Sequence, residues 1–176
     1  MNTTRRIFLG LLVSLAGSRL VNPVLGAPQR GRGRGRGQGR GQNDPEFQKD
    51  RQDFQYLLSR HKEFRREVQL LPNGVQTVTE SDDPEVTSVI QEHVAAMHRR
   101  VTKNKPIRRR DPLFAALFNN ARWTSMTVKN TAKGVHVVVT SDKKFVVPLI
   151  QAHAKVVSAF VKLGFVEARK NHPVPK

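Results

Sequence analysis

Two histidines and one methionine are the residues of this chain best placed to bind a metal. His93 follows Val86 and Ile90 and precedes Met97 and Val101 at the spacing of one helix face. Its imidazole is therefore expected to point inward among apolar side chains. Burial disfavours the charged imidazolium, and the neutral form is the one that ligates haem iron, copper or zinc. Met97 shares the face and is a candidate soft ligand.

An internal repeat gives the chain a second histidine in the same setting. Residues 54–101 match residues 114–161 when the chain is aligned with itself. The first set of matching residues is Gly74, Val75, Val78, Ser81, Asp82, Val86, Ile90, Gln91, His93 and Val101. The second set is Gly134, Val135, Val138, Ser141, Asp142, Val146, Ile150, Gln151, His153 and Val161. His153 is thus expected on the inward face of the equivalent helix.

Two interpretations of these histidines are open at the level of sequence. In the first, an approximate two-fold relation brings His93 and His153 together around haem or a transition metal, with Met97 as a third ligand. In the second, each histidine bonds a buried carbonyl or the matching glutamine, and Met97 fills the core. The chain has no cysteine, which excludes thiolate zinc sites and iron–sulfur clusters.

Each repeat is predicted to form a helix, a β-hairpin and a second helix. Apolar periodicity and capping residues place the helices at 54–64, 81–103, 113–121 and 141–170. Short apolar runs around glycine-containing turns place the strands at 67–71, 75–80, 125–130 and 135–140. The repeats, 54–103 and 113–170, are expected to form one α+β domain over 53–176. In it, an antiparallel sheet carries helices packed on one face.

The first residues resemble a twin-arginine export signal. Arg5 and Arg6 precede Ile7, Phe8 and Leu9, and small residues end the segment near residue 27. The resemblance predicts a removable leader over 1–27 and a periplasmic or secreted protein. It also implies export of the folded chain, commonly with a cofactor already loaded. The apolar run is too short for a membrane helix, so no integral membrane span is expected in the mature chain. The alternative is an amphipathic first helix of the domain.

Basic residues favour an anionic partner. The formal net charge is +17, and residues 28–52 are predicted to be a disordered linker rich in arginine and glycine. Envelope polyanions or nucleic acid are the expected partners. The candidate anion-binding residues come from this linker and from the basic loop 103–111: Arg30, Arg32, Arg34, Arg36, Arg40, Arg108, Arg109 and Arg110. The alternative is that the linker is a tether and the loop a solvated connector.

Several strings resemble those of an uncharacterised family of exported bacterial proteins that has a twin-arginine-type leader and a duplicated helix–hairpin–helix domain. They are SDDPEV, IQEHVAAMH, RDPLFAALF, SDKKFVVPLIQAHAKVVSAFV and NHPVP. The resemblance covers most of the chain after Phe54. It implies a shared fold and an envelope location, and it brings no catalytic residues.

No enzyme signature stands beside the histidines. The sequence has no nucleophile elbow, no phosphate-binding glycine loop and no isolated carboxylate pair on a predicted core face. It therefore predicts a small, basic, non-catalytic exported protein that binds a metal ion or haem through the inward histidines. The alternative is a module that binds polyanions or nucleic acid through the Arg/Gly segment and the basic loop.

Overall fold

The structure is a computed structural model that describes residues 44–176. The predicted leader and residues 28–43 of the predicted linker lie outside the described residues. The elements of the first half are α1 (Pro45–Ser59), β1 (Phe64–Leu71), β2 (Gly74–Ser81) and α2 (Pro84–Thr102). Those of the second half are α3 (Pro112–Asn119), the short helix η1 (Ala121–Trp123), β3 (Ser125–Thr131), β4 (Gly134–Thr140), α4 (Val147–Leu163) and α5 (Phe165–Ala168). The predicted order of helix, two strands and helix occurs in each half.

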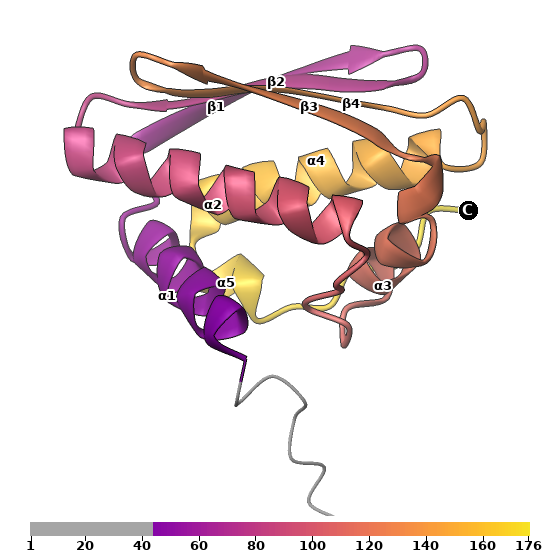
Figure 1. The fold of residues 1–176 in the computed structure, drawn as a ribbon, viewed down its shortest axis with the longest axis horizontal. Helices are drawn as coiled ribbons and strands as arrows, with labels where there is room; N and C mark the ends of the chain where they lie inside the picture. The colour runs from indigo at the N-terminus through magenta and orange to yellow at the C-terminus, as the bar shows by residue number, and fades with distance from the viewer. Residues whose placement is uncertain (1–43) are drawn as a thin grey trace, which may run out of the picture. The chain divides into compact units, whose positions relative to one another are not determined.

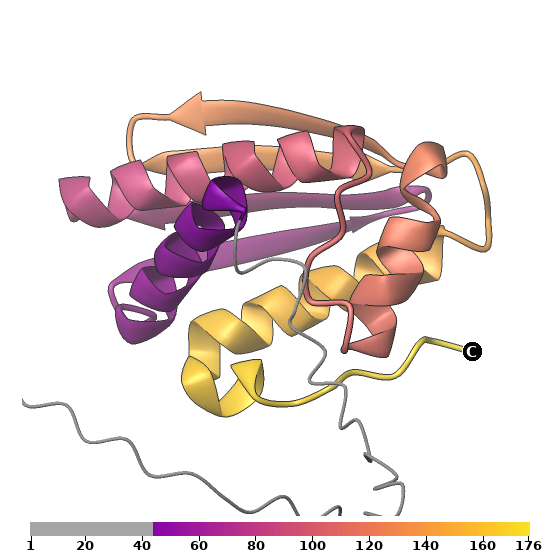
Figure 2. The same cartoon turned by 60° about the horizontal axis from the view of Figure 1, so that its bottom comes forward.

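The four strands form one antiparallel sheet in the order β1-β2-β4-β3. The two halves therefore meet at the central pair, β2 and β4. All helices lie on one face of the sheet, with α2 and α4 next to it and α1, α3 and α5 further away (Figures 1 and 2). This is the α+β architecture that the sequence predicts. Within residues 44–176, no helix has the length and apolar character needed to cross a membrane.

Two glycines allow the central strands to approach each other. A Cβ atom on Gly74 would lie 2.0 Å from the carbonyl oxygen of Val139, and one on Gly134 would lie 2.0 Å from that of Thr79. Real Cβ atoms do not tolerate such contacts with backbone. Glycine at these matching positions is thus required by the pairing of the two halves.

Two glutamines attach each half to the other. Gln91 of α2 donates from Nε2 to the carbonyl oxygens of Thr131 (3.0 Å) and Gly134 (3.1 Å), which flank the turn between β3 and β4. Gln151 of α4 donates to those of Leu71 (3.1 Å) and Gly74 (3.3 Å) at the turn between β1 and β2. Each helix therefore fixes the hairpin of the opposite half.

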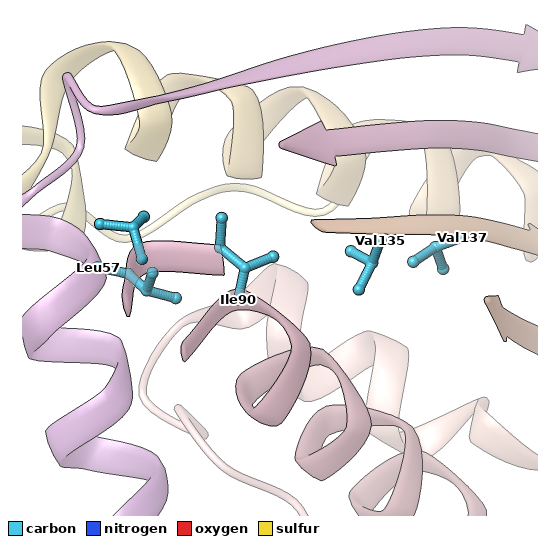
Figure 3. Close-up of a cluster of buried hydrophobic side chains, with 5 residues drawn as sticks. Leu57, Ile90, Val135 and Val137 are labelled. Atoms are coloured by element: carbon cyan, nitrogen blue, oxygen red, sulfur yellow. The ribbon is translucent and has the colours of Figure 1, made fainter. Parts of the chain in front are cut away.

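The core lies between the sheet and the two helices next to it. One cluster joins Leu57 of α1, Val86 and Ile90 of α2, and Val135 and Val137 of β4. Figure 3 shows Leu57, Ile90, Val135 and Val137 pointing into the space between these elements. A second cluster contains the residues Val75, Val146, Ile150 and Ala154. The repeated apolar residues Val75, Val86 and Ile90 and their matches Val135, Val146 and Ile150 are therefore core residues.

The predicted starts of the two helices of the first half, α1 and α2, are wrong. α1 begins at Pro45 because the Asp44 side chain caps it by accepting from the backbone N–H of Glu46. The predicted boundary between linker and domain near residue 52 is thus too late. α2 is capped by Asp83 rather than by Ser81 or Asp82.

The helix predicted at 141–170 corresponds to α4 and differs from it at both ends. α4 begins at Val147 instead of Ser141, because the Ser141 hydroxyl donates to the carbonyl oxygen of Trp123 (2.6 Å) and the chain then turns over 142–146. It ends at Leu163 because Gly164 has a φ of +57°, which a helix does not accept. The remaining turn, α5, continues in a new direction.

Candidate functional site

Two adjoining cavities lie between the sheet and the helices. The larger, of about 320 Å³, is lined by α1, β1, α2 and α4, and the smaller, of about 220 Å³, lies between the sheet, α2, α3 and α4. Their common wall consists of Arg66, His93, Val94, Met97, Ile107 and Val157. Most of the remaining lining is aliphatic or aromatic. Cavities of this size and character are typical of small-molecule sites.

The three candidate ligands line the same space. His93 of α2 and His153 of α4 both border the smaller cavity, and Met97 lies beside them. His93 and Met97 also border the larger one. The two helices bring these side chains together because both pack against the sheet at equivalent positions. The structure thus places both halves of the proposed histidine pair at one site.

Neither imidazole has a hydrogen bond to the described residues. Nδ1 of His93 is buried and unpaired, and no contact from residues 44–176 satisfies the ring nitrogens of His153. The matching glutamines bond the hairpin turns instead. The interpretation that a buried carbonyl or the matching glutamine satisfies each histidine is therefore wrong.

Aromatic rings hold the two imidazoles in place. Phe54 stacks on His93 with ring centres 6.1 Å apart, and Phe114 meets the His153 ring edge-on at 5.1 Å. Both phenylalanines contact Phe160, at 5.8 Å and 6.3 Å. Phe54 and Phe114 are matching positions of the two repeats, so each histidine has the same kind of partner. The contacts orient the rings without using their nitrogens.

Both imidazoles are neutral at neutral pH. Burial lowers the pKa of His93 below its usual 6.5, although the nearby carboxylates of Asp53 and Asp50 act in the opposite direction. Burial and the positive charge of Arg66 lower the pKa of His153 to about 4. Each ring therefore has one lone pair and one N–H, which is the form that binds a metal or hydrogen-bonds a ligand.

Arg66 is a charged residue of the cavity wall that the sequence analysis did not single out. It lies on β1, and its Nη1 donates to the hydroxyl of Thr79 at 2.7 Å. Its Nε is buried without a partner among the described residues. Burial lowers its pKa to about 10, so the guanidinium stays charged at neutral pH. Strand alternation was the available signal, because Arg66 has the same parity as Phe64 and Val68.

One arginine of the basic loop 103–111 is turned inward, whereas the sequence predicts that it is exposed. The Arg108 guanidinium turns inward, where it donates to Asp111 (3.2 Å) and to the carbonyl oxygens of Ala168 (3.0 Å) and Lys170 (2.8 Å). It is therefore not an exposed anion-binding residue. Arg109 and Arg110 are exposed as expected. The other candidates, Arg30, Arg32, Arg34, Arg36 and Arg40, lie outside the described residues.

A buried ionic cluster fastens the C-terminal segment beside the larger cavity. The His172 ring contacts Asp111 through Nδ1 (2.6 Å) and Glu167 through Nε2 (3.2 Å). The same ring meets Phe160, which lines the larger cavity, with centres 6.0 Å apart. Because these polar groups satisfy one another, the cluster is a structural clamp behind the cavity wall rather than part of the cavity surface.

The fold and the site define an α+β domain with a mostly apolar cavity between the sheet and the helices. Two imidazoles that have no hydrogen-bond partner within residues 44–176 line this cavity. In residues 44–176, no group of three or more His, Asp or Glu side chains is arranged to hold a metal ion. Compared with known proteins, the chain matches no family model, no curated protein and no solved structure. Any function therefore has to be argued from the cavity itself.

The pKa of His153 predicts how the domain responds to acid. The imidazole has its ordinary pKa of 6.5 in the unfolded chain and a pKa of about 4 in the folded domain. Between these values the unfolded chain binds a proton that the folded domain does not, so the free energy of unfolding falls as the pH falls from 6.5 toward 4. His153→Leu is expected to flatten this dependence in urea titrations. An equally steep fall in the variant would contradict the assignment.

Proposed function

We propose that the domain is a non-catalytic binding protein that holds a mostly apolar ligand in the cavity, with neutral His93 and His153 as its polar contacts. One observation carries the proposal. The matched glycines, serines and glutamines of the two repeats each make a backbone contact that the fold needs. The matched histidines make no hydrogen bond with the described residues, although both face the same cavity.

The size and lining of the cavity support an organic ligand. A volume of about 320 Å³ is roughly twice that of an apolar cavity of ~150 Å³ that binds benzene. Empty space of this kind destabilises a folded domain because the lining atoms lose dispersion contacts. A ligand that fills the space restores those contacts, and the free imidazole nitrogens then fix its orientation.

Haem or another transition-metal complex is the more specific form of this proposal. Two neutral imidazoles and the Met97 thioether border one space, and each is a known axial ligand of haem iron. A metal complex that brings its own donors needs only one or two ligands from the protein. A bare divalent cation is less suitable, because the charge of Arg66 on the same wall would repel it.

The location and the second candidate partner rest on the sequence. We propose a periplasmic or secreted protein on the strength of the leader-like residues 1–27, and export in the folded state agrees with a ligand bound inside the domain. Envelope polyanions or nucleic acid remain candidate partners for the exposed Arg109 and Arg110. They are too large for the cavity and concern a separate surface.

The cavity proposal predicts binding of a neutral apolar probe. N-phenylnaphthylamine is expected to bind the domain in a one-to-one complex and to increase in fluorescence. Val157→Trp places an indole on the wall shared by both cavities and should abolish the increase. Lys155→Trp adds the same ring on the exposed side of α4 and serves as the control. Equal binding by both tryptophan variants, or none by the native domain, would rule out the cavity as a binding site.

If the ligand is haem or another transition-metal complex, the protein is expected to have a characteristic absorption spectrum. The protein purified from its native envelope fraction, or titrated with haem, is expected to show an absorption band that depends on imidazole ligation. His93→Ala and His153→Ala should each shift or remove the band. His136→Ala changes a histidine at an outward position of β4 and should leave it unchanged. A colourless, metal-free protein that takes up no haem would exclude this form and leave the apolar-ligand proposal standing.

A further inference from the structure

The inner face of the sheet differs between the two halves. In the repeat alignment, Arg66, Thr77 and Thr79 of the first half correspond to Met126, Val137 and Val139 of the second. All of these side chains line one or both cavities. At these three positions the first half is polar and the second half apolar. The matched pair Phe64 and Thr124 has the opposite polarity, so the difference is confined to Arg66, Thr77 and Thr79 and their matches.

The guanidinium of Arg66 has no acidic partner among residues 44–176. A guanidinium has five N–H donors, and the only hydrogen bond from Arg66 within residues 44–176 is the one to Thr79. Two acidic residues of α1, of which Asp50 lines the larger cavity, are engaged elsewhere. Asp50 pairs with Arg100, and Asp53 pairs with Lys49. Arg66 is half-buried, and its Nε is fully buried. A charge partly removed from water without a counter-ion is unfavourable, so an anionic partner from outside the chain would relieve it.

We propose that the ligand of this cavity carries a carboxylate, which Arg66 binds, while the apolar part of the ligand extends toward Met126, Val137 and Val139. The inference rests on the proposed function and specifies its ligand class. The planar fork of a guanidinium matches the two oxygens of a carboxylate. His93, on the wall shared with Arg66, has its buried Nδ1 free for a further hydrogen bond. The carboxylate comes either from an aliphatic acid or from a haem propionate.

The test compares two probes that differ only in their head group. Titration calorimetry with decanoate and with decanol is expected to show about ten- to hundredfold tighter binding of decanoate, the range of one hydrogen-bonded charge pair. Arg66→Met gives the first half the residue of the second and should reduce decanoate affinity to that of decanol. Arg65→Met removes the neighbouring exposed arginine, which pairs with Glu80 and Asp82, and should preserve the difference.

Different results would contradict the carboxylate inference and the proposed function. Continued binding of decanol and of N-phenylnaphthylamine by Arg66→Met shows that the variant is folded and the cavity intact. Measurable binding of decanoate and decanol by the native domain with equal affinity, or a preference that survives Arg66→Met, would overturn the carboxylate inference alone. Failure of every probe to bind the native domain, haem included, would overturn the proposed function and this inference with it.

A haem titration identifies the source of the carboxylate. If haem binds and decanoate does not, the propionate is the partner, and Arg66→Met must weaken haem binding while His93 and His153 still determine its spectrum. If decanoate binds and haem does not, the ligand is an aliphatic acid. Haem binding that is indifferent to Arg66→Met, without any decanoate preference, would contradict the inference. The unliganded Arg66→Met domain is also expected to melt at a higher temperature, because it lacks the unpaired charge.

Discussion

The antiparallel pairing of β2 with β4 is the constraint on which the rest of the structure depends. It joins the two halves into one sheet, and it is possible because Gly74 and Gly134 have no side chain at the points of closest approach. The same pairing puts α2 and α4 beneath a common face, where Gln91 and Gln151 fix each helix to the hairpin of the other half (Figure 1). Two equivalent positions on these helices therefore face one space, and both are histidine.

This arrangement retains features that oppose stability. The space between the helices and the sheet is incompletely filled, and it contains free imidazole nitrogens and the unpaired guanidinium of Arg66. Elsewhere in residues 44–176 the buried charges have an opposite charge beside them, as in the Arg100–Asp50 pair and in the contacts of His172 with Asp111 and Glu167. Two further buried atoms, Nη2 of Arg100 and the hydroxyl of Tyr56, also lack a hydrogen-bond partner. Polar and charged groups that lack partners at one place, while similar groups nearby have them, are characteristic of a functional site. In residues 44–176, the cavity wall holds such groups in Arg66 and His93.

Much of the fold could be predicted from the sequence because apolar periodicity, turn residues and the internal repeat all agree on it. The inward position of His93 followed from the same helix spacing. The starts of α1 and α2 could not be placed from apolar pattern alone, since the capping carboxylates of Asp44 and Asp83 decide them. Arg66 was overlooked because a charged residue on an edge strand is usually solvated. The buried contacts of Arg108 and Asp111 could not be predicted from the sequence, because their partners, Ala168 and His172, lie far along the chain near its C-terminus.

Nuclear magnetic resonance of the side chains would test the central claim most directly. With the domain labelled in ¹⁵N, the imidazole signals of His93 and His153 and the Nε signal of Arg66 can be followed during titration with decanoate or haem. If one ligand contacts all three side chains, these three signals change together at one saturable stoichiometry, whereas those of His136 and Arg65 stay constant. Signals of the cavity residues that remain unchanged, or that change only together with the outer-face signals, would contradict it.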